Sequence, residues 1–357
     1  MTGARIPIWL DCDPGQDDTV AIIIACYSKY FDLRGISTVH GNVSLKNTTY
    51  NTLRVLTAIN RTDIPVFPGA AKPLGNYSEV FAADVHGVTG LNGSDLLPAS
   101  RMQARDKDTF FPHLARTIRD LDGKLNIVAT GPLTNIALFF KQYPDLREKI
   151  EILSVMGGGF KLFNKNENAE FNYYCDPFAA KQVVDDPVLS RRMIQASLDI
   201  TMKVFISLDV QTRILDGKTH QKASNFRAML FELIDSTNKR MLTLNVPGYE
   251  GPVIHDPVAL MALLQFHHLN NKLRFKYDKR KFTVSVDPQT YGAIENVSIL
   301  SEEEEGVIVL TDLDVGEFWN EVLDVYDIAD KHAFMNTLSR QQLQEEYRID
   351  TAEKHNI

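Results

Sequence analysis

The chain has 357 residues, enough for one large α/β domain or two ordinary ones, and its 44% hydrophobic content is typical of a globular protein with a sizeable core. It carries 38 Lys and Arg against 46 Asp and Glu, and this net charge of -8 argues against nucleic acid or an anionic membrane as the main partner. Three cysteines are too few for a disulfide framework, and no signal peptide or transmembrane run is visible, so we expect a cytoplasmic protein.

The most informative stretch lies near the N-terminus, where carboxylates follow a short apolar run. Residues 6–10 (Ile-Pro-Ile-Trp-Leu) are typical of a buried parallel strand. Four aspartates come directly after it: Asp11, Asp13, Asp17 and Asp18. Pro14-Gly15 predicts a tight turn, and the apolar spacing beyond it predicts that Asp17 and Asp18 lie in the first turn of a helix.

One aspartate at such a place is a common helix cap, but capping does not explain four of them. Carboxylates this close repel one another unless a cation neutralises them, and an all-oxygen cluster suits a hard ion such as Ca²⁺ or Mg²⁺. The sequence therefore predicts a metal site at the end of the first strand.

Strands and helices then alternate along the chain. Strands are predicted at 33–39, 64–67, 125–129, 149–156 and 194–198, and helices at 47–56, from 109, from 177, at 226–233 and at 258–264. The alternation predicts an α/β fold with a mainly parallel, Rossmann-like central sheet in a single domain at 1–334, followed by a polar C-terminal tail at 335–357. Residues 275–310 are β-rich, and the glutamate run 302–305 within them is most simply a solvated turn.

Polar residues follow several of these strands, and they should meet at the sheet edge where ligands bind in open α/β folds. The segments are His40-Gly41-Asn42, Thr130-Gly131-Pro132, Gly157-Gly158-Gly159 and the loop with Asn164, Glu170 and Asn172. The long loop 69–105, which contains His86, is of a length that is usually functional or mobile. Asp256 precedes the helix at 258–264, where a simple N-cap is a strong alternative to a site residue.

Six motifs in this order resemble the inosine-uridine preferring nucleoside hydrolase family. They are D-C-D-P-G-Q-D-D at 11–18, H-G-N at 40–42, T-G-P-L-T-N at 130–135, M-G-G at 156–158, A-E-F-N at 169–172 and H-D-P at 255–257. The resemblance runs from Ile6 to at least Leu264. It implies the nucleoside hydrolase fold over 1–334, a bound Ca²⁺, a homodimer or homotetramer, and hydrolysis of ribonucleosides to ribose and free base. Uridine is the expected first substrate, with inosine or cytidine as further ones.

The resemblance also implies roles for individual residues. It places the Ca²⁺ ligands at Asp13, Asp18, Asp256 and the backbone carbonyl of Thr130, and makes Asp13 the general base acting on a water at the ion. The implied ribose-binding set is Asp17, Asn42, Asn164, Glu170 and Asn172, with Met156 packing beneath the sugar. Asp, Asn and Glu side chains give both the donors and the acceptors that three ribose hydroxyls require, and nearby carboxylates stabilise an oxocarbenium-like transition state.

Two histidines are placed near the leaving base by the same resemblance, His255 as general acid and His86 as a base contact. From the residues alone, an exposed imidazole without a role is an equally good interpretation of His86, and His40 is better explained as structural. Two positions depart from the family pattern: Gln16 stands where D-P-G-H-D-D has His, and Met202 stands where L-D-V-T-H has His.

Two other functions compete with hydrolysis. Asp11-Cys12-Asp13 also resembles the D-x-D opening of enzymes that transfer phosphoryl groups through an aspartate nucleophile, although Pro14-Gly15 replaces the Thr expected there. A Ca²⁺-dependent ribose- or nucleoside-binding protein with impaired catalysis is the second alternative, and Gln16 and Met202 motivate it. Turnover of a phosphate ester would identify the first, and ribose binding without base release would identify the second.

Overall fold

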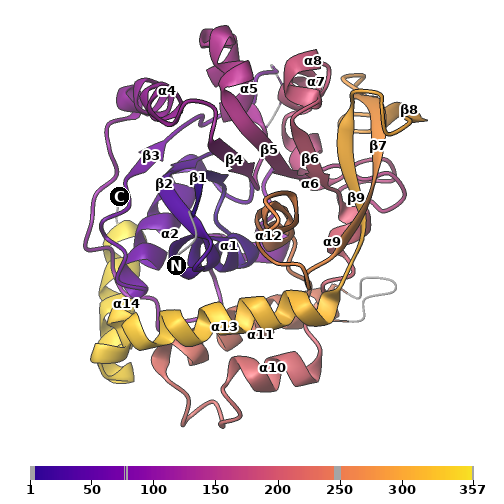
Figure 1. Ribbon diagram of the computed structural model, residues 1–357. Helices are drawn as coiled ribbons and strands as arrows, with labels where there is room; N and C mark the ends of the chain where they lie inside the picture. Colours follow the sequence, from indigo (N-terminus) through magenta and orange to yellow (C-terminus); the bar gives the residue numbers. More distant parts are fainter. Residues whose placement is uncertain (1–4, 76, 78, 245–250, 356–357) are drawn as a thin grey trace.

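A computed structural model describes residues 5–75, 77, 79–244 and 251–355. Within them nine strands form one sheet: β1 (Ile6–Cys12), β2 (Phe31–Thr38), β3 (Val66–Pro68), β4 (Leu125–Ala129), β5 (Ile150–Met156), β6 (Met193–Ala196), β7 (Phe275–Val284), β8 (Ile294–Ile299) and β9 (Val307–Leu313). Their order is β3-β2-β1-β4-β5-β6-β9-β7-β8 (Figure 1). Neighbours from β3 to β9 pair in parallel, whereas β7 is antiparallel to β9 and β8. The expected mainly parallel α/β sheet is confirmed.

The sheet is buried on both faces, as its strand β1 illustrates. Successive side chains of a strand point to opposite faces, and Ile8 and Leu10 belong to one hydrophobic core while Trp9 belongs to the other. The first core is covered by α1 (Gln16–Tyr27), α2 (Leu45–Ala58), α10 (Leu208–Ile214), α11 (Asn225–Thr243), α12 (Asp256–Phe266) and α13 (Val315–His332). The second is covered by α4 (Phe110–Leu121), α5 (Thr134–Gln142), α7 (Pro177–Val184) and α8 (Pro187–Ser190), on the other side of the sheet in Figure 1.

Short helices occupy several of the connections between these elements. They are α3 (Ala83–His86), α6 (Phe171–Cys175), α9 (Leu198–Thr201) and the 3₁₀ turns η1 (Lys107–Thr109), η2 (Pro144–Lys149) and η3 (Phe334–Thr337). The chain then forms α14 (Arg340–His355). Leu343 of α14 is fully buried, and the Tyr347 ring lies 5.1 Å from the guanidinium of Arg54 in α2. The polar segment after residue 340 is therefore a helix that packs against α2. The predicted boundary between the domain and the C-terminal tail at residue 334 stays a prediction.

Most predicted elements lie within one to three residues of the observed ones, and β4 matches its prediction throughout. Three differences concern element ends. The strand predicted at 64–67 is observed two residues later, as β3, and Leu198, predicted to end a strand, begins α9. The helix predicted at 226–233 continues to Thr243, and its start is fixed by the Ser224 side chain, whose Oγ accepts a hydrogen bond from the Arg227 amide.

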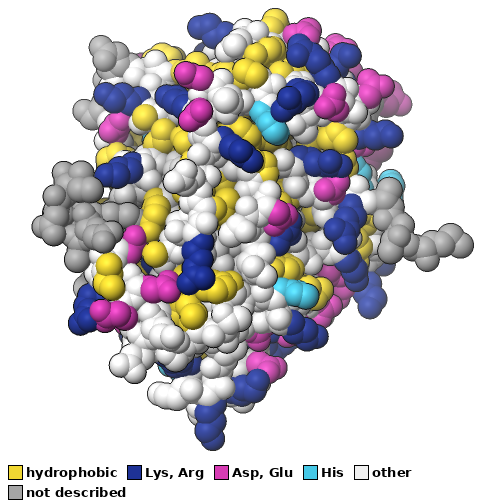
Figure 2. Space-filling view, turned by 90° about the vertical axis from the view of Figure 1, so that its left-hand side faces the viewer, with side chains coloured by type: hydrophobic (Ala, Val, Ile, Leu, Met, Phe, Trp, Pro, Cys, Tyr) yellow, Lys and Arg dark blue, Asp and Glu magenta, His cyan; other side chains and the backbone are white. Residues whose placement is uncertain are grey.

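Charges of both signs are interspersed on the molecular surface. Figure 2 shows Lys and Arg next to Asp and Glu side chains over the face at the left of Figure 1, with hydrophobic groups in small patches between them. The glutamate run 302–305 is exposed in the connection before β9. None of the helices in the described part of the chain is long and apolar enough to cross a membrane.

Candidate active site

The site is assembled where β1, β2 and β4 end. Cys12 pairs with Thr38 and Asp11 pairs with Ala129, so the three strands finish side by side. The residues that follow these ends, Asp13, Asn42 and Thr130, therefore come together at the carboxyl edge of the sheet. Asp256 joins them from the start of α12, which packs against α1.

Asp13 is buried, and two glycine turns enclose its carboxylate. Its Oδ2 accepts a hydrogen bond from the Asn42 amide at 2.7 Å. A Cβ at Gly41 would lie 2.0 Å from Oδ2, and one at Gly131 would lie 2.5 Å from Oδ1, so both turns need glycine for this close approach. Oδ1 is also buried, but it has no hydrogen-bond partner among the described residues. One oxygen of Asp13 is thus fixed by the backbone and the other is left for a ligand.

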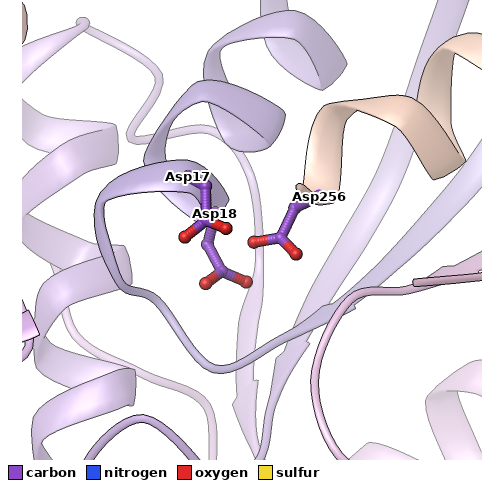
Figure 3. A group of neighbouring side chains, drawn as sticks. All are labelled: Asp17, Asp18 and Asp256. Atoms are coloured by element: carbon purple, nitrogen blue, oxygen red, sulfur yellow. The ribbon is translucent and has the colours of Figure 1, made fainter. Parts of the chain in front are cut away.

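Asp18 lies in the first turn of α1, and hydrogen bonds fix both of its carboxylate oxygens. Its Oδ1 accepts hydrogen bonds from the Thr130 hydroxyl at 2.9 Å and from the Asp13 amide at 3.3 Å, and its Oδ2 accepts one from the Gly15 amide at 3.0 Å. Asp17 and Asp256 face it, and one carboxylate oxygen from each of the three aspartates lies within 4.8 Å of the others (Figure 3).

Asp11 takes a different role from the other aspartates of the opening motif. Its Oδ2 accepts hydrogen bonds from the Ser37 hydroxyl and from Asn135 Nδ2, the latter at 2.8 Å. Burial raises its pKa to about 7, although both hydrogen bonds act in the opposite direction. Asp11 therefore ties β1 to its neighbours, and the carboxylate that completes the group around Asp18 comes from Asp256, more than 200 residues later in the sequence.

Burial and mutual repulsion make this group unfavourable as a set of free anions. The pKa of Asp13 lies well above its usual range because of burial and then the charge of Asp18. Burial and the charge of Asp17 raise the pKa of Asp18 to about 6, and burial together with Asp17 and Asp18 holds the pKa of Asp256 well above its usual range. A bound cation would relieve both effects.

The donor set fits a hard divalent cation. Every side-chain ligand in the group is a carboxylate oxygen, the type that such ions prefer, whereas Asp13, whose buried Oδ1 is unpaired, lies outside the group of three whose oxygens come within 4.8 Å of one another. The family resemblance implies that Thr130 contributes its backbone carbonyl to the ion. In this structure that carbonyl accepts a hydrogen bond from Asn172 Nδ2 at 2.8 Å, which uses one of its two lone pairs. Asp17, assigned to ribose, lies within the acidic group itself.

Asn42 and Asn172 both donate hydrogen bonds to the edge that carries this acidic group. The side-chain Nδ2 of Asn42 donates to the backbone carbonyl of Asp13 at 3.1 Å and to Asp18 Oδ2 at 3.4 Å. Asn172 Nδ2 donates to the Thr130 carbonyl and, at 3.2 Å, to the carbonyl of Met156, whose side chain is buried beside it. Both side-chain nitrogens therefore donate to oxygen atoms of the protein, and these hydrogen bonds fix the orientation of both side chains.

Glu170 and Asn164 have different surroundings. Glu170 is buried and caps α6 by accepting hydrogen bonds from the amides of Asn172 and Tyr173, and it also accepts one from Gly158 at 2.7 Å. Burial raises its pKa although these three bonds lower it. Asn164 is exposed, and its Oδ1 accepts a hydrogen bond from the Phe171 amide at 2.9 Å. The structure thus places Glu170 beside Asn172 and leaves Asn164 in the outer loop.

His255 precedes α12 and lies against the acidic group. Its amide donates to Asp17 Oδ2 at 3.4 Å, and its Nδ1 lies 2.8 Å from the hydroxyl of buried Thr201. Burial lowers the pKa of His255, and the charge of Asp17 opposes that effect. Thr201 cannot be identified as a partner of His255 from the sequence, because nothing in the sequence links two residues that are 54 positions apart.

His86 reaches the same edge from the long loop. Its Nδ1 contacts Gln16 Oε1, and its ring covers Gly15, where a Cβ would lie 2.4 Å from Nδ1. Burial lowers the pKa of His86 while Asp17 acts to raise it, so the imidazole lies near the acidic group. His40, in contrast, is buried and bonded to the Thr134 hydroxyl at 3.1 Å, as a structural residue would be.

Comparisons with known proteins agree with this geometry. The family model of the inosine-uridine preferring nucleoside hydrolases matches residues 8–320. The chain is 35% identical to the uridine nucleosidase of Saccharomyces cerevisiae, in an alignment that covers 93% of this chain and 98% of that protein. It is 37% identical to the pyrimidine-specific ribonucleoside hydrolase RihA of Escherichia coli, in an alignment that covers 73% of this chain and 80% of that protein. The purine-preferring ribonucleoside hydrolase of Gardnerella vaginalis shares the fold, with a TM-score of 0.77 and 24% identity over 91% of this chain and 99% of that one. The chain therefore belongs to the inosine-uridine preferring nucleoside hydrolase family.

Proposed function

We propose that this nucleoside hydrolase acts with a bound Ca²⁺ and prefers uridine, which it splits into ribose and uracil in nucleoside salvage. The observation that carries the proposal is the environment of Asp13, a buried carboxylate with one fixed and one unpaired oxygen beside three further carboxylates. The uridine nucleosidase of yeast, similar over 98% of its length, supports uridine as the first substrate. Inosine and cytidine are the further substrates to test.

The ion would bind to Asp13, Asp18, Asp256 and the second lone pair of the Thr130 carbonyl, with Asp17 beside it. Ca²⁺ bound there would lower the pKa of a water and orient it toward the sugar. Asp13 is the proposed general base, because its buried carboxylate lies next to Asp18 and Asn42 and could take the proton that the attacking water gives up.

The ribose would lie over Met156 and between the polar groups that follow β2 and β5. Asp17, Asn42, Asn172 and Glu170 are the proposed hydroxyl-binding groups, and Asn164 joins them from the outer loop. Their carboxylates would also stabilise the positive charge that builds on the ribose as the glycosidic bond lengthens. A substrate without the 2′-hydroxyl would leave part of this set unpaired.

The electron pair of the broken bond leaves with the base, which then needs a proton. His255 is the proposed general acid, because it lies beside Asp17 and its orientation is fixed through Nδ1 by Thr201. That arrangement leaves Nε2 to meet the base. His86, whose pKa is lowered by burial and by the charge of His255 and raised by that of Asp17, is the proposed contact to the base.

We also propose that the protein is cytoplasmic and assembles as a homodimer or homotetramer. Three free cysteines, two of them buried, suit a reducing compartment. Sedimentation of the purified protein tests the assembly.

Release of base from uridine, cytidine, inosine and 2′-deoxyuridine tests the proposed activity. The assay is run with Ca²⁺, with a chelator, and after Ca²⁺ is restored. We expect fastest release from uridine, loss of activity with chelator and recovery with Ca²⁺. Equal activity in chelator would contradict the metal assignment, and equal turnover of uridine and 2′-deoxyuridine would remove Asp17 and its neighbours from the ribose site.

A further inference from the structure

Gln16, the first residue of α1, connects the acidic turn to the loop that carries His86. Its Oε1 is hydrogen-bonded to His86 Nδ1, and its Nε2 donates to the carbonyl of Asn92 at 3.3 Å. Gln16 is buried, with 7% of its surface exposed, so few other partners are available to it. The family has His at this position, and the contact is therefore made by a residue in which this chain departs from the family pattern.

The two contacts together fix which atom of the amide faces the histidine. A carbonyl oxygen only accepts hydrogen bonds, so the group of Gln16 that points to Asn92 must be the NH₂. Oε1 then faces His86, and because an amide oxygen also only accepts, the proton of the contact belongs to His86 Nδ1. A neutral imidazole has one N–H, so Nε2 carries a lone pair. Among the described residues, Nε2 has no hydrogen-bond partner.

The orientation of Gln16 is itself held by α11. The Asn92 carbonyl accepts further hydrogen bonds from Ser236 Oγ at 2.9 Å and from Arg240 Nη2 at 3.2 Å. The same guanidinium donates through Nη1 to the carbonyl of Val85, next to His86, at 3.1 Å. The loop is thus tied to α11 on both sides of the histidine, and Gln16 connects it to the catalytic edge.

We propose that Gln16 is a positioning residue that holds neutral His86 in its Nδ1–H form, so that Nε2 accepts a hydrogen bond from a ring N–H of the nucleobase. The favoured substrates are then nucleosides whose base has such a group, as uracil has at N3. This inference rests on the proposed nucleoside hydrolysis and adds the chemical feature of the base that is recognised.

The kinetic test compares uridine with 3-methyluridine, which lacks the N3–H, and with p-nitrophenyl riboside, which has no base. Gln16→Leu should lower kcat/KM for uridine about tenfold, the rate equivalent of one hydrogen bond, and should change the value for the other two substrates less than about twofold.

In a His86→Ala background the same substitution should have no further effect, because Gln16 acts only through His86. Asn47→Ala is the matched control, since Asn47 Nδ2 donates to the Val88 carbonyl of the same loop at 3.4 Å but contacts neither Gln16 nor Asn92, and it should leave the ratio of uridine to 3-methyluridine unchanged. An equal loss on all three substrates, or an undiminished loss in the His86→Ala background, would overturn the proposal.

The tautomer is measured separately, by long-range ¹H–¹⁵N spectra of the full chain with labelled histidine, using His86→Ala to assign the signal. We expect the wild-type ring to be protonated at Nδ1 and the preference to be lost in Gln16→Leu. A wild-type ring protonated at Nε2 overturns the inference even if uridine is hydrolysed. If the ring is protonated at Nδ1 but no nucleoside is hydrolysed, the proposed function fails, and the recognition of the base fails with it.

Discussion

Asp256→Asn should separate the cost of crowding the carboxylates from the benefit of the ion. At an effective dielectric constant of about 20, two unit charges at the 4.8 Å limit of this group repel each other by about 3 kcal/mol. Closer approach would increase this repulsion and protonation would reduce it, since burial and the neighbouring carboxylates raise the pKa of both Asp18 and Asp256. The unfolding entropy of a 357-residue chain is about 0.75 kcal/mol/K, so relief of about 3 kcal/mol would raise Tm by about 4 °C.

The assay is thermal unfolding in chelator and in excess Ca²⁺. In chelator, Asp256→Asn should melt a few degrees above wild type, since the loss of a negative charge at the start of α12 costs only about 0.3–1 kcal/mol. In Ca²⁺ at about 100 times Kd, wild type should gain about 2.7 kcal/mol, or 3–4 °C, and the variant much less. Glu303→Gln, in the exposed glutamate run, makes the same change in net charge and should change neither Tm. A variant that melts below wild type in chelator and keeps the full Ca²⁺ shift would refute the reasoning.

Three further outcomes follow from the site. Asp13→Asn should lower kcat by about 10²–10⁴, because it removes the general base while keeping its shape, and a loss below about tenfold in a base-release assay would contradict that role. His255→Ala should slow inosine hydrolysis far more than hydrolysis of p-nitrophenyl riboside, whose leaving group needs no acid, and Thr201→Val should show the same selectivity with a smaller loss. Equal losses on both substrates would assign the pair to ribose binding. Burial lowers the pKa of His40 to about 4, so the unfolded chain takes up the proton first and stability should fall as pH drops from about 6.5 toward 4. His40→Gln should flatten that part of the Tm profile relative to wild type, and parallel profiles would show that the buried ring is not what limits acid stability.

The sequence predicted those parts of the site that depend on strand ends. A buried apolar run followed by Pro14-Gly15 determines where β1 stops and α1 begins, and parallel pairing then forces the residues after β1, β2 and β4 to one edge. For this reason Asp13, Asn42 and Thr130 can be grouped from the sequence alone. Membership of the family also answers the alternative of phosphoryl transfer, which rested on Asp11 and Asp13.

Contacts between side chains that lie far apart in the sequence could not be predicted in the same way. The pairing of Thr201 with His255 and that of Gln16 with His86 depend on how loops fold over the edge, and no periodicity or turn signal encodes them. The role of Asp11 was also missed, since its hydrogen bonds to β2 and α5 appear only when the strands are placed together. The packing of α14 could not be predicted from its polar composition. It depends on one buried leucine and on the contact of Tyr347 with Arg54, which do not form a periodic apolar face in the sequence.

The two halves of the site are held by different physical means. Asp13 and Asp18 are fixed by backbone amides and by glycine turns at strand ends, so their geometry depends on the sheet and tolerates little change. His86 is placed by a loop that contacts the rest of the site through one backbone hydrogen bond, from the Ala82 amide to the Asn42 carbonyl at 3.0 Å, and through the side chains of Gln16 and Arg240. Substitutions at such positions can alter how the base is recognised without moving the groups that bind the ion and attack the sugar. Base preference in this chain should therefore respond to single changes at the loop, whereas the loss of ribose discrimination should require changes at the sheet edge itself.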